Sequence, residues 1–317
     1  MVLETLKILI ISLVVLLPVL LSVAYLTLID RKIMAAVQLR KGPNVVGLGL
    51  LQPFADALKL AVKEAIIPVK SNKIMFVFAP SYSLWINLSA WSVIPFDKST
   101  VTHQSLSVMI VLALTSLAVY GLIISGWASN SRYAFLGSLR SAAQMISYEV
   151  VLGLLILLVC LFSQSFNLID INEAQESVWF IVPLIPWFFI YLIAVVAETN
   201  RTPFDLPEAE AELVAGYNVE YSSLPFAAFF IAEYGSYLMW SHLTVIYFWG
   251  GWSSWPTASL GYCLKLSFMI FFFSWARATY PRYRWDQLMY LTWRYLLPMT
   301  LASVFLLTLI FAITAIK

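Results

Sequence analysis

Apolar runs of about 20 residues recur along the chain and alternate with shorter polar segments. A helix of about 20 apolar residues crosses the hydrocarbon core of a bilayer and satisfies its own backbone hydrogen bonds there. The pattern therefore predicts an all-α, polytopic membrane protein with about eight transmembrane helices. The expected spans are Leu6–Ile29, Ile74–Ile94, Leu106–Trp127, Ala142–Phe162, Val178–Ala197, Tyr221–His242, Leu260–Ala276 and Leu288–Ile316.

The polar segment after the first span carries a second kind of pattern. Polar residues recur at helical spacing on one face, namely Gln52, Asp56, Lys59 and Lys63, and apolar residues occupy the other, namely Phe54, Leu58, Val62 and Ala65. This favours an amphipathic helix at the membrane surface. A simple interfacial anchor explains the same pattern. Because no linker or internal repeat divides the chain, residues 1–317 are expected to form a single membrane domain.

Composition supports a membrane protein and excludes several functions. The chain is 61% hydrophobic and 11% charged, against roughly 25% charged residues in soluble domains. A net charge of +2 gives no indication of a nucleic-acid partner. The two cysteines and two histidines are far apart, and nucleotide-binding glycine motifs are missing. We expect no metal, cofactor or nucleotide bound by this chain itself, and no cleavable targeting segment before the first span.

Most of the 19 Lys and Arg residues lie in or beside the odd-numbered loops. Basic residues concentrate on the cytoplasmic or matrix side of membrane proteins. The odd loops are therefore predicted to face the cytoplasm or matrix.

Acidic residues lie where a membrane makes them costly, which is typical of functional sites. Glu149 falls in the fourth predicted span and Glu233 in the sixth. The loop between the fifth and sixth spans adds six acids and one arginine, interspersed with apolar residues: Glu198, Asp205, Glu208, Glu210, Glu212 and Glu220, with Arg201 among them. Carboxylates buried together bind protons more tightly and titrate as a coupled set. A solvated acidic loop, or a set of structural ion pairs, is the alternative.

Arginines and aromatic residues suggest a cavity near these acids. Arg31 and Arg277 are expected at the same membrane face, and Phe226 and Phe230 lie one helical turn apart in the sixth span. These residues could form the rim and wall of a cavity for a polar-headed lipid. Membrane-surface anchoring and ordinary helix packing are the simpler explanations.

Three segments carry a family resemblance that covers essentially the whole chain. They are DRK at 30–32 with QLRKGPNVVG at 38–47 and QPFADALK at 52–59, then ETNRTPFDL at 198–206 continuing to EY at 220–221, and WARATYPRYRWDQ at 275–287. They resemble the signatures of the H subunit family of proton-pumping NADH:quinone oxidoreductase, respiratory complex I. One position departs: Asp30 stands where the family usually has Glu, so its carboxylate is one methylene shorter and it is not counted among the candidate site residues.

The resemblance implies a subunit that is not catalytic alone but works in NADH:ubiquinone reductase. It implies the membrane part of a ubiquinone tunnel, with Arg31, Asp56, Lys59, Phe226, Phe230 and Arg277 along it. It also implies a chain of groups that couples quinone reduction to proton translocation, namely Glu149, Glu198, Arg201, Asp205, Glu208, Glu210, Glu212, Glu220 and Glu233.

The implied partners are the hydrophilic-arm subunits at the quinone site, the neighbouring membrane-arm subunits, ubiquinone and membrane lipids. FMN and iron–sulfur clusters would lie in partner subunits. The expected location is the mitochondrial inner membrane, with a bacterial plasma membrane as the alternative. An ion-coupled transporter and the anchor subunit of a related membrane-bound hydrogenase stay open as other functions.

Overall fold

The computed structural model describes residues 2–96, 104–205, 216–252 and 258–315, and within these ranges it is helical without a strand. The helices are α1 (Val2–Val37), η1 (Val46–Gly49), α2 (Gln52–Val62), α3 (Lys73–Ala90), α4 (Ser107–Ala128), α5 (Arg132–Ser163), α6 (Leu168–Glu173), α7 (Ile185–Glu198), η2 (Gly216–Asn218), α9 (Ser223–Phe248), α10 (Ala258–Thr279), α11 (Trp285–Leu291), the π-helical turn η3 (Thr292–Leu296) and α12 (Leu297–Ala315). The all-helical prediction is confirmed for the described part of the chain.

Each predicted span overlaps a helix, and several boundaries differ from the prediction, two of them for clear local reasons. Among the described residues, the helices that are long and apolar enough to cross a bilayer are Ser12–Val37, Ser107–Ala128, Arg132–Ser163 and Trp285–Ile313. Helix α5 begins ten residues before the predicted span because the Ser131 side chain caps it, accepting a hydrogen bond from the Ala134 amide at 3.3 Å. Helix α7 begins later than predicted, at Ile185, with Pro186 in its first turn.

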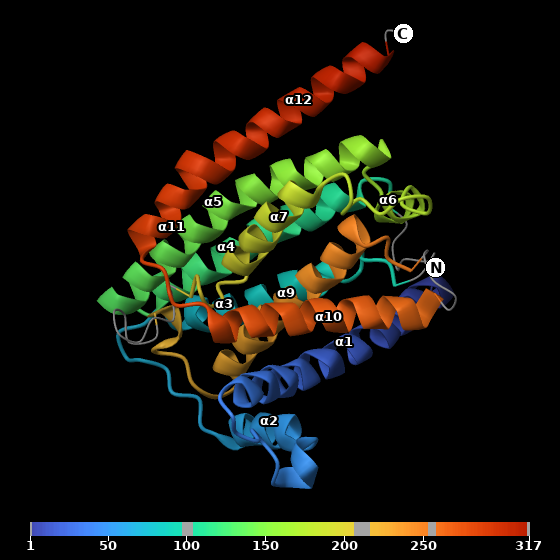
Figure 1. Cartoon of the computed structure of the whole chain (residues 1–317). Helices are drawn as coiled ribbons and strands as arrows, with labels where there is room; N and C mark the ends of the chain where they lie inside the picture. Colours follow the sequence, from blue (N-terminus) through green and yellow to red (C-terminus); the bar gives the residue numbers. More distant parts are fainter. Residues whose placement is uncertain (1, 97–103, 206–215, 253–257, 316–317) are drawn as a thin grey trace.

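Helix α9 lies inside the bundle and packs against α1, α3 and α10 (Figure 1). Helix α4 joins α3 to α5, and α5 in turn packs against α7 and α12. Helix α12 runs along one side and projects from the rest, whereas α2 lies at the edge of the bundle beside the end of α1 (Figure 1). The hydroxyl of Ser223, at the start of α9, donates to the carbonyls of Leu60 and Lys63 at 3.0 and 2.7 Å, which fastens the end of α2 to α9.

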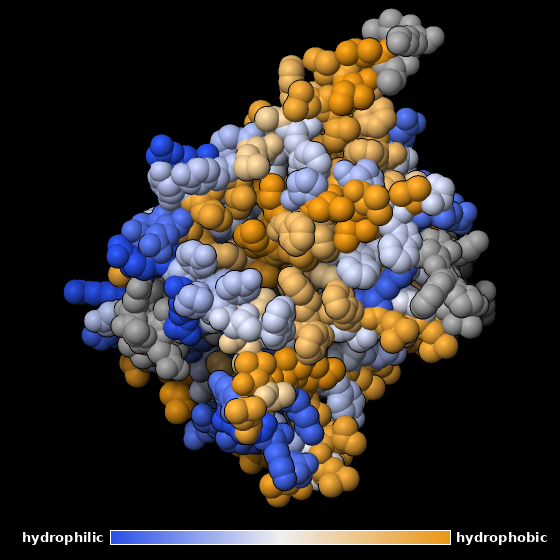
Figure 2. All heavy atoms as spheres, in the orientation of Figure 1, coloured by the Kyte–Doolittle hydropathy of each residue, from blue (hydrophilic) through white to orange (hydrophobic). Residues whose placement is uncertain are grey.

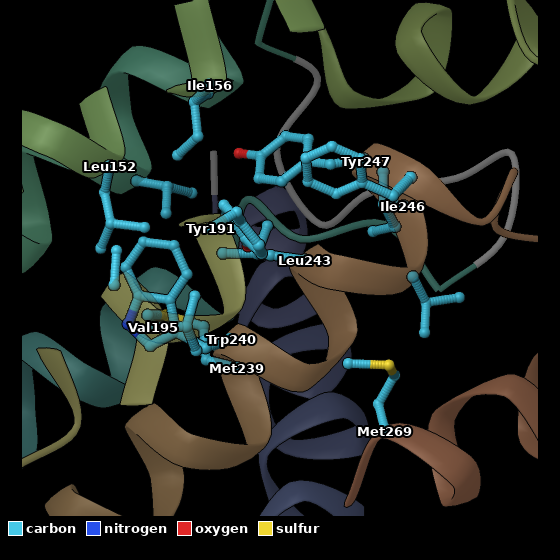
Figure 3. Close-up of a cluster of buried hydrophobic side chains, with 14 of the residues drawn as sticks. Leu152, Ile156, Tyr191, Val195, Met239, Trp240, Leu243, Ile246, Tyr247 and Met269 are labelled. Carbon is cyan, nitrogen blue, oxygen red and sulfur yellow. The ribbon is translucent and has the colours of Figure 1, made fainter. Parts of the chain in front are cut away.

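The apolar core lies where α5, α7, α9 and α10 meet (Figure 3). Leu152, Tyr191, Trp240 and Tyr247 are at most 1% exposed there. Helices in a membrane associate through close packing of side chains, because lipid tails are as apolar as the side chains themselves. The core therefore fixes the relative positions of four helices whose ends carry the polar groups described below.

The surface separates apolar from polar residues by region. Figure 2 shows apolar side chains in a broad area across the middle of the view and along the projecting α12, while hydrophilic side chains gather at the left edge and around α2 at the bottom. An apolar surface on the flanks of a helix bundle is the arrangement that lipid requires.

Candidate functional site

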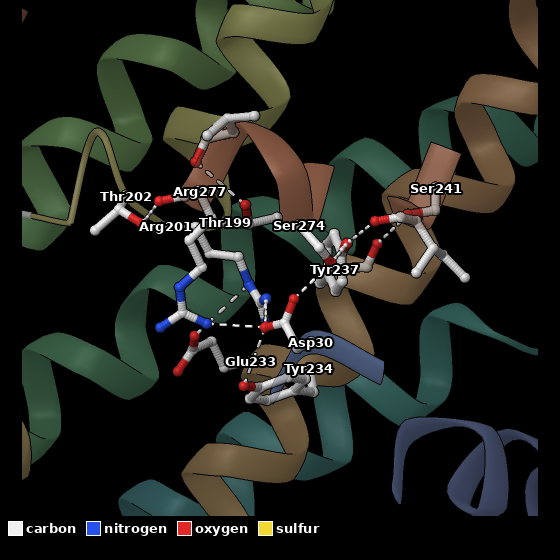
Figure 4. Close-up of polar contacts among 12 residues, drawn as sticks. Asp30, Thr199, Arg201, Thr202, Glu233, Tyr234, Tyr237, Ser241, Ser274 and Arg277 are labelled. Carbon is white, nitrogen blue, oxygen red and sulfur yellow. Dashed lines mark hydrogen bonds and ion pairs between the residues drawn. The ribbon is translucent and has the colours of Figure 1, made fainter. Parts of the chain in front are cut away.

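A buried carboxylate near the end of α1 is the centre of a charged cluster. Asp30 is 0% exposed, and its Oδ2 atom accepts hydrogen bonds from Arg201 Nη1 and Arg277 Nη1, both at 2.8 Å (Figure 4). The Ser274 hydroxyl donates to Oδ1 at 2.5 Å, and the Tyr234 hydroxyl donates to Oδ2 at 3.4 Å. A buried ion is tolerated only when it is paired and hydrogen-bonded. With two guanidinium groups and two hydroxyls around it, Asp30 is a fixed negative charge.

The segment after α7 holds Arg201 in place through backbone contacts. Gln144 of α5 donates its amide hydrogens to the carbonyls of Ala197 at 2.7 Å and Phe204 at 2.9 Å, on either side of Arg201 in the sequence. The Thr202 hydroxyl donates to the carbonyl of Arg277 at 3.3 Å. Arg201 is thus positioned from both α5 and α10, although it belongs to no helix.

The surroundings of Arg201 keep its charge. Its guanidinium carbon lies 4.2 Å from the ring centre of Tyr234 and 4.0 Å from that of Tyr237, and Nε lies 3.9 Å from Glu233 Oε1 (Figure 4). Aromatic faces attract a desolvated cation. Burial opposes the charge, but Asp30, both tyrosines and Glu233 hold the pKa of Arg201 above its ordinary value. Arg201 therefore joins the Asp30 cluster to a second carboxylate, Glu233.

Glu233 and Glu198 line one small cavity between α3, α7 and α9, which we call the acid cavity. Its volume is ≈ 80 Å³, and its polar lining includes Ser83, Asn87, Asn200 and Ser236. Glu198, the last residue of α7, is 4% exposed. The two carboxylates therefore border one polar space of a size that can hold water.

Glu149 extends this group of acids into α5. It accepts a hydrogen bond from the Ser116 hydroxyl of α4 and lies within electrostatic reach of Glu198. Carboxylates on α5, α7 and α9 thus come together, although 84 residues separate the first from the last (149 to 233).

A larger, mostly apolar cavity of ≈ 530 Å³ lies on another face of α9, between α1, α2 and α9. We call it the apolar cavity. Phe226 and Phe230 form part of its wall, and its charged lining residues are Arg31, Asp56 and Lys59. Arg31 Nη1 and Asp56 Oδ2 form a half-exposed ion pair at 2.7 Å. The cavity therefore combines an apolar interior with a few charged groups, as small-molecule sites commonly do.

Ring contacts along α9 connect the apolar cavity to the charged cluster. The ring centres of Phe226 and Phe230 are 5.7 Å apart, and those of Phe230 and Tyr234 are 5.0 Å apart. The Tyr234 hydroxyl then reaches Asp30. A wall residue of the apolar cavity is thus one contact away from the Asp30 cluster, and Arg201 continues the series to Glu233 and the acid cavity.

Comparison with known proteins identifies the family. A family model for NADH dehydrogenase matches residues 10–308. The chain belongs to the NADH dehydrogenase family. Over 304 residues it is 53% identical to the NADH-ubiquinone oxidoreductase chain 1 of Chondrus crispus, covering 93% of each protein. Over 305 residues it is 52% identical to the H subunit of the NADH-quinone oxidoreductase of Rhodospirillum rubrum, covering 93% of this chain and 90% of the relative.

The other predicted site residues line neither the acid cavity nor the apolar cavity, or they lie outside the described residues. Asp205 is buried and receives a hydrogen bond from Arg282 at 3.4 Å, and Glu220 is partly exposed between η2 and α9. Arg277 belongs to the Asp30 cluster and is not among the residues that line the apolar cavity. Three predicted acids lie outside the described residues, namely Glu208, Glu210 and Glu212.

The residue at the centre of the cluster is one that the sequence-based set of site residues omits. Asp30 reaches both Arg201 and Arg277 with its short carboxylate. Its position in an apolar run is a usable signal, since a charge inside a membrane helix needs a partner. Ser274 and Gln144 give no such signal, because a serine or glutamine in a membrane helix has many ordinary structural roles.

Proposed function

We propose that this chain is the core membrane subunit of an NADH:ubiquinone oxidoreductase. In this proposal it forms the membrane part of the ubiquinone tunnel and couples electron transfer to proton translocation through its buried carboxylates. The names of its relatives, an NADH-ubiquinone oxidoreductase chain 1 and the H subunit of an NADH-quinone oxidoreductase, support the complex. The contact series from Phe230 through Tyr234 to Asp30 carries the coupling, because it joins the apolar cavity to the acids.

The apolar cavity is the proposed tunnel. Its ≈ 530 Å³ falls within the roughly 300–1,000 Å³ of small-molecule sites, and an isoprenoid tail needs the apolar walls that Phe226 and Phe230 supply. Arg31, Asp56 and Lys59 offer polar contacts to a quinone head that passes them. Arg277 acts from the Asp30 cluster.

Reduction of ubiquinone to ubiquinol takes up two electrons and two protons. The electrons come from partner subunits that hold FMN and iron–sulfur clusters, and this chain supplies binding and electrostatics. A change in charge at the quinone end acts on the Asp30 cluster through Tyr234. Asp30 already accepts hydrogen bonds from two arginines and two hydroxyls, so it keeps its charge. The electrostatic change therefore acts on Arg201 and through it on Glu233. Glu233, Glu198 and Glu149 then take up or release protons. Asp205, Glu220 and the acids of 206–215 continue the chain.

The proposal also includes the location and orientation of the chain in the membrane. Eight spans form a single membrane domain in the mitochondrial inner membrane, with odd loops facing the matrix and α2 lying on the membrane surface. The basic residues of the odd loops support this orientation, because cations are retained on the matrix or cytoplasmic side.

Glu198→Gln in the assembled complex tests the coupling. The substitution keeps size and hydrogen bonding but removes the exchangeable carboxyl proton. We expect NADH:ubiquinone turnover and proton translocation to fall by roughly 10²-fold, while electron transfer to a water-soluble acceptor that is reduced by the hydrophilic subunits is unchanged. Glu173→Gln, an exposed residue of α6, is the matched control. Wild-type turnover and stoichiometry in Glu198→Gln would contradict the coupling role.

The tunnel is tested separately at Phe230. Replacing Phe230 by Ala removes one aromatic wall of the apolar cavity, so we expect a higher KM for ubiquinone in the assembled complex. A photoreactive ubiquinone should also label the segment of α9 around Phe226. No labelling of α9 together with an unchanged KM would contradict the tunnel.

A further inference from the structure

Two neutral side chains of α3, Ser83 and Asn87, line the acid cavity beside Glu198 and Glu233. Ser83 is 7% exposed, and its Oγ has no hydrogen-bond partner among the described residues; the same holds for Asn87 Oδ1. Glu198 Oε2, in the same lining, is also buried without a partner in the described part of the chain. Buried oxygens of this kind are almost always satisfied by protein or by ordered water. Their convergence on one cavity therefore indicates a water-binding site.

Two glycines on neighbouring helices make room for these side chains. A Cβ at Gly235 of α9 would collide with Asn87 Oδ1, and a Cβ at Gly121 of α4 would collide with Ser83 Oγ. Small residues let membrane helices approach closely. Here polar groups of α3 occupy the space left by the missing side chains, Ser83 against α4 and Asn87 against α9.

We propose that Ser83 and Asn87 are positioning residues that hold a short file of water molecules between Glu233 and Glu198. This inference rests on the proposed function and adds residues that the acidic pattern does not contain. About 10–15 Å³ is enough for one water, so a cavity of ≈ 80 Å³ accommodates a small cluster.

The water molecules can carry a proton between Glu233 and Glu198 in either direction. A proton leaving the Glu233 carboxyl binds to the first water, that water passes one of its own protons to the next, and the last proton binds to the Glu198 carboxylate. Charge moves from one acid to the other and the waters are regenerated. A hydroxyl and a primary amide both donate and accept hydrogen bonds. They can orient the waters without trapping the proton, as an additional carboxylate would.

The test compares variants of α3 in the assembled complex reconstituted into vesicles. Asn87→Leu keeps the bulk but removes the polar group, and Ser83→Ala removes a single oxygen. We expect Asn87→Leu to lower ubiquinone-linked turnover and proton translocation by about tenfold, the effect of losing one positioned hydrogen bond in the transfer step. The KM for ubiquinone should change by less than about twofold, because binding occurs in the other cavity. Ser83→Ala should show a smaller loss in the same direction.

Two further variants separate positioning from packing. Asn87→Ser restores a group that binds water and should recover most of the activity, whereas a packing defect would not be repaired by a smaller side chain. Ser81→Ala, on the exposed face of the same helix, should behave as wild type. The solvent deuterium isotope effect on turnover should rise in Asn87→Leu, since the transfer becomes rate-limiting.

Suppose that Ser83→Ala and Asn87→Leu show wild-type turnover and pumping while Glu198→Gln is inactive. This result would contradict the proposed role of Ser83 and Asn87 and leave the coupling role of the acids intact. Wild-type behaviour of Glu198→Gln would instead overturn the proposed function and this inference with it. If Asn87→Leu does not assemble, Ser83→Ala decides the matter, since it removes one atom and keeps the packing.

Discussion

The two ends of the bundle bury polar groups in different ways. Where α1 ends and α9 begins, full charges meet: Asp30, Arg201 and Arg277 form one cluster, and Glu233 adjoins it. At the opposite end, where α9 finishes, a buried neutral side chain connects the helix ends. Gln175 is 0% exposed and donates to the carbonyls of Ile171 and Ile246.

Gln175 completes its hydrogen bonds with backbone groups alone. Its Oε1 atom accepts from the amides of Phe180 at 3.2 Å and Gly250 at 3.1 Å. Lys265 nearby likewise donates to the carbonyls of Trp249 at 2.6 Å and Gly251 at 3.1 Å. These contacts tie loops and helix ends together, and none of them places two carboxylates side by side.

The difference separates structural polar groups from functional ones. A membrane protein can secure its helix ends with amides at modest cost, because a neutral group is less expensive to bury than an ion. Concentrating charges at one end is therefore unnecessary for folding. The proposed function gives a reason for it, since proton translocation requires groups that change charge.

The largest expected effect is that of Asp30→Asn. The substitution removes the negative charge that pairs with the buried Arg201 and the partly exposed Arg277, and breaking a buried ion pair in this way costs about 3–5 kcal/mol. We expect little assembled complex and a strongly lowered Tm, measured on detergent-solubilised membranes. Asp30→Glu keeps the charge and should assemble. An Asp30→Asn complex that assembles and melts like wild type would show that the charged end is not held by this residue.

Gln175→Leu should have an intermediate effect of a different kind. It removes the hydrogen bonds of Gln175 to the backbone at Ile171, Ile246, Phe180 and Gly250, so we expect a loss of roughly 2–4 kcal/mol, read as a lower Tm. Activity per assembled complex should stay at the wild-type level, because this end is structural. Gln104→Leu, an exposed glutamine, is the control. A selective loss of proton translocation at normal Tm would show that the end of the bundle around Gln175 takes part in coupling.

Asp56→Asn should have the smallest effect on stability. The Arg31 and Asp56 side chains are 44% and 38% exposed, and such an ion pair contributes less than about 1 kcal/mol. The KM for ubiquinone should nevertheless rise several-fold if these residues line the tunnel. Glu64→Gln, exposed just after the end of α2, should change neither quantity. A drop in Tm as large as that of Asp30→Asn would remove the distinction between the buried cluster and the exposed pair.

The hydropathy pattern of the sequence predicts which segments are helical better than it predicts where each helix begins and ends. Apolar runs identify every long helix of the described chain, because length and hydropathy decide what can cross a bilayer. The start of α5 depends on a cap at Ser131, and the start of α7 on Pro186, and the hydropathy pattern registers neither. The acids of the candidate site can be named from the sequence, since charges inside membrane helices are rare. Which of them share a cavity cannot.

The sequence by itself determined the membrane class of this protein, its helical segments, its family and most of the candidate acids, since each follows from neighbouring residues or from a contiguous motif. Only the tertiary structure decided that Asp30 pairs with Arg201 and Arg277, and that α3 contributes Ser83 and Asn87 to the acid cavity. Those contacts join residues far apart in the chain. Their geometry depends on how closely the helices approach at positions such as Gly121 and Gly235, which the packing of the whole bundle sets.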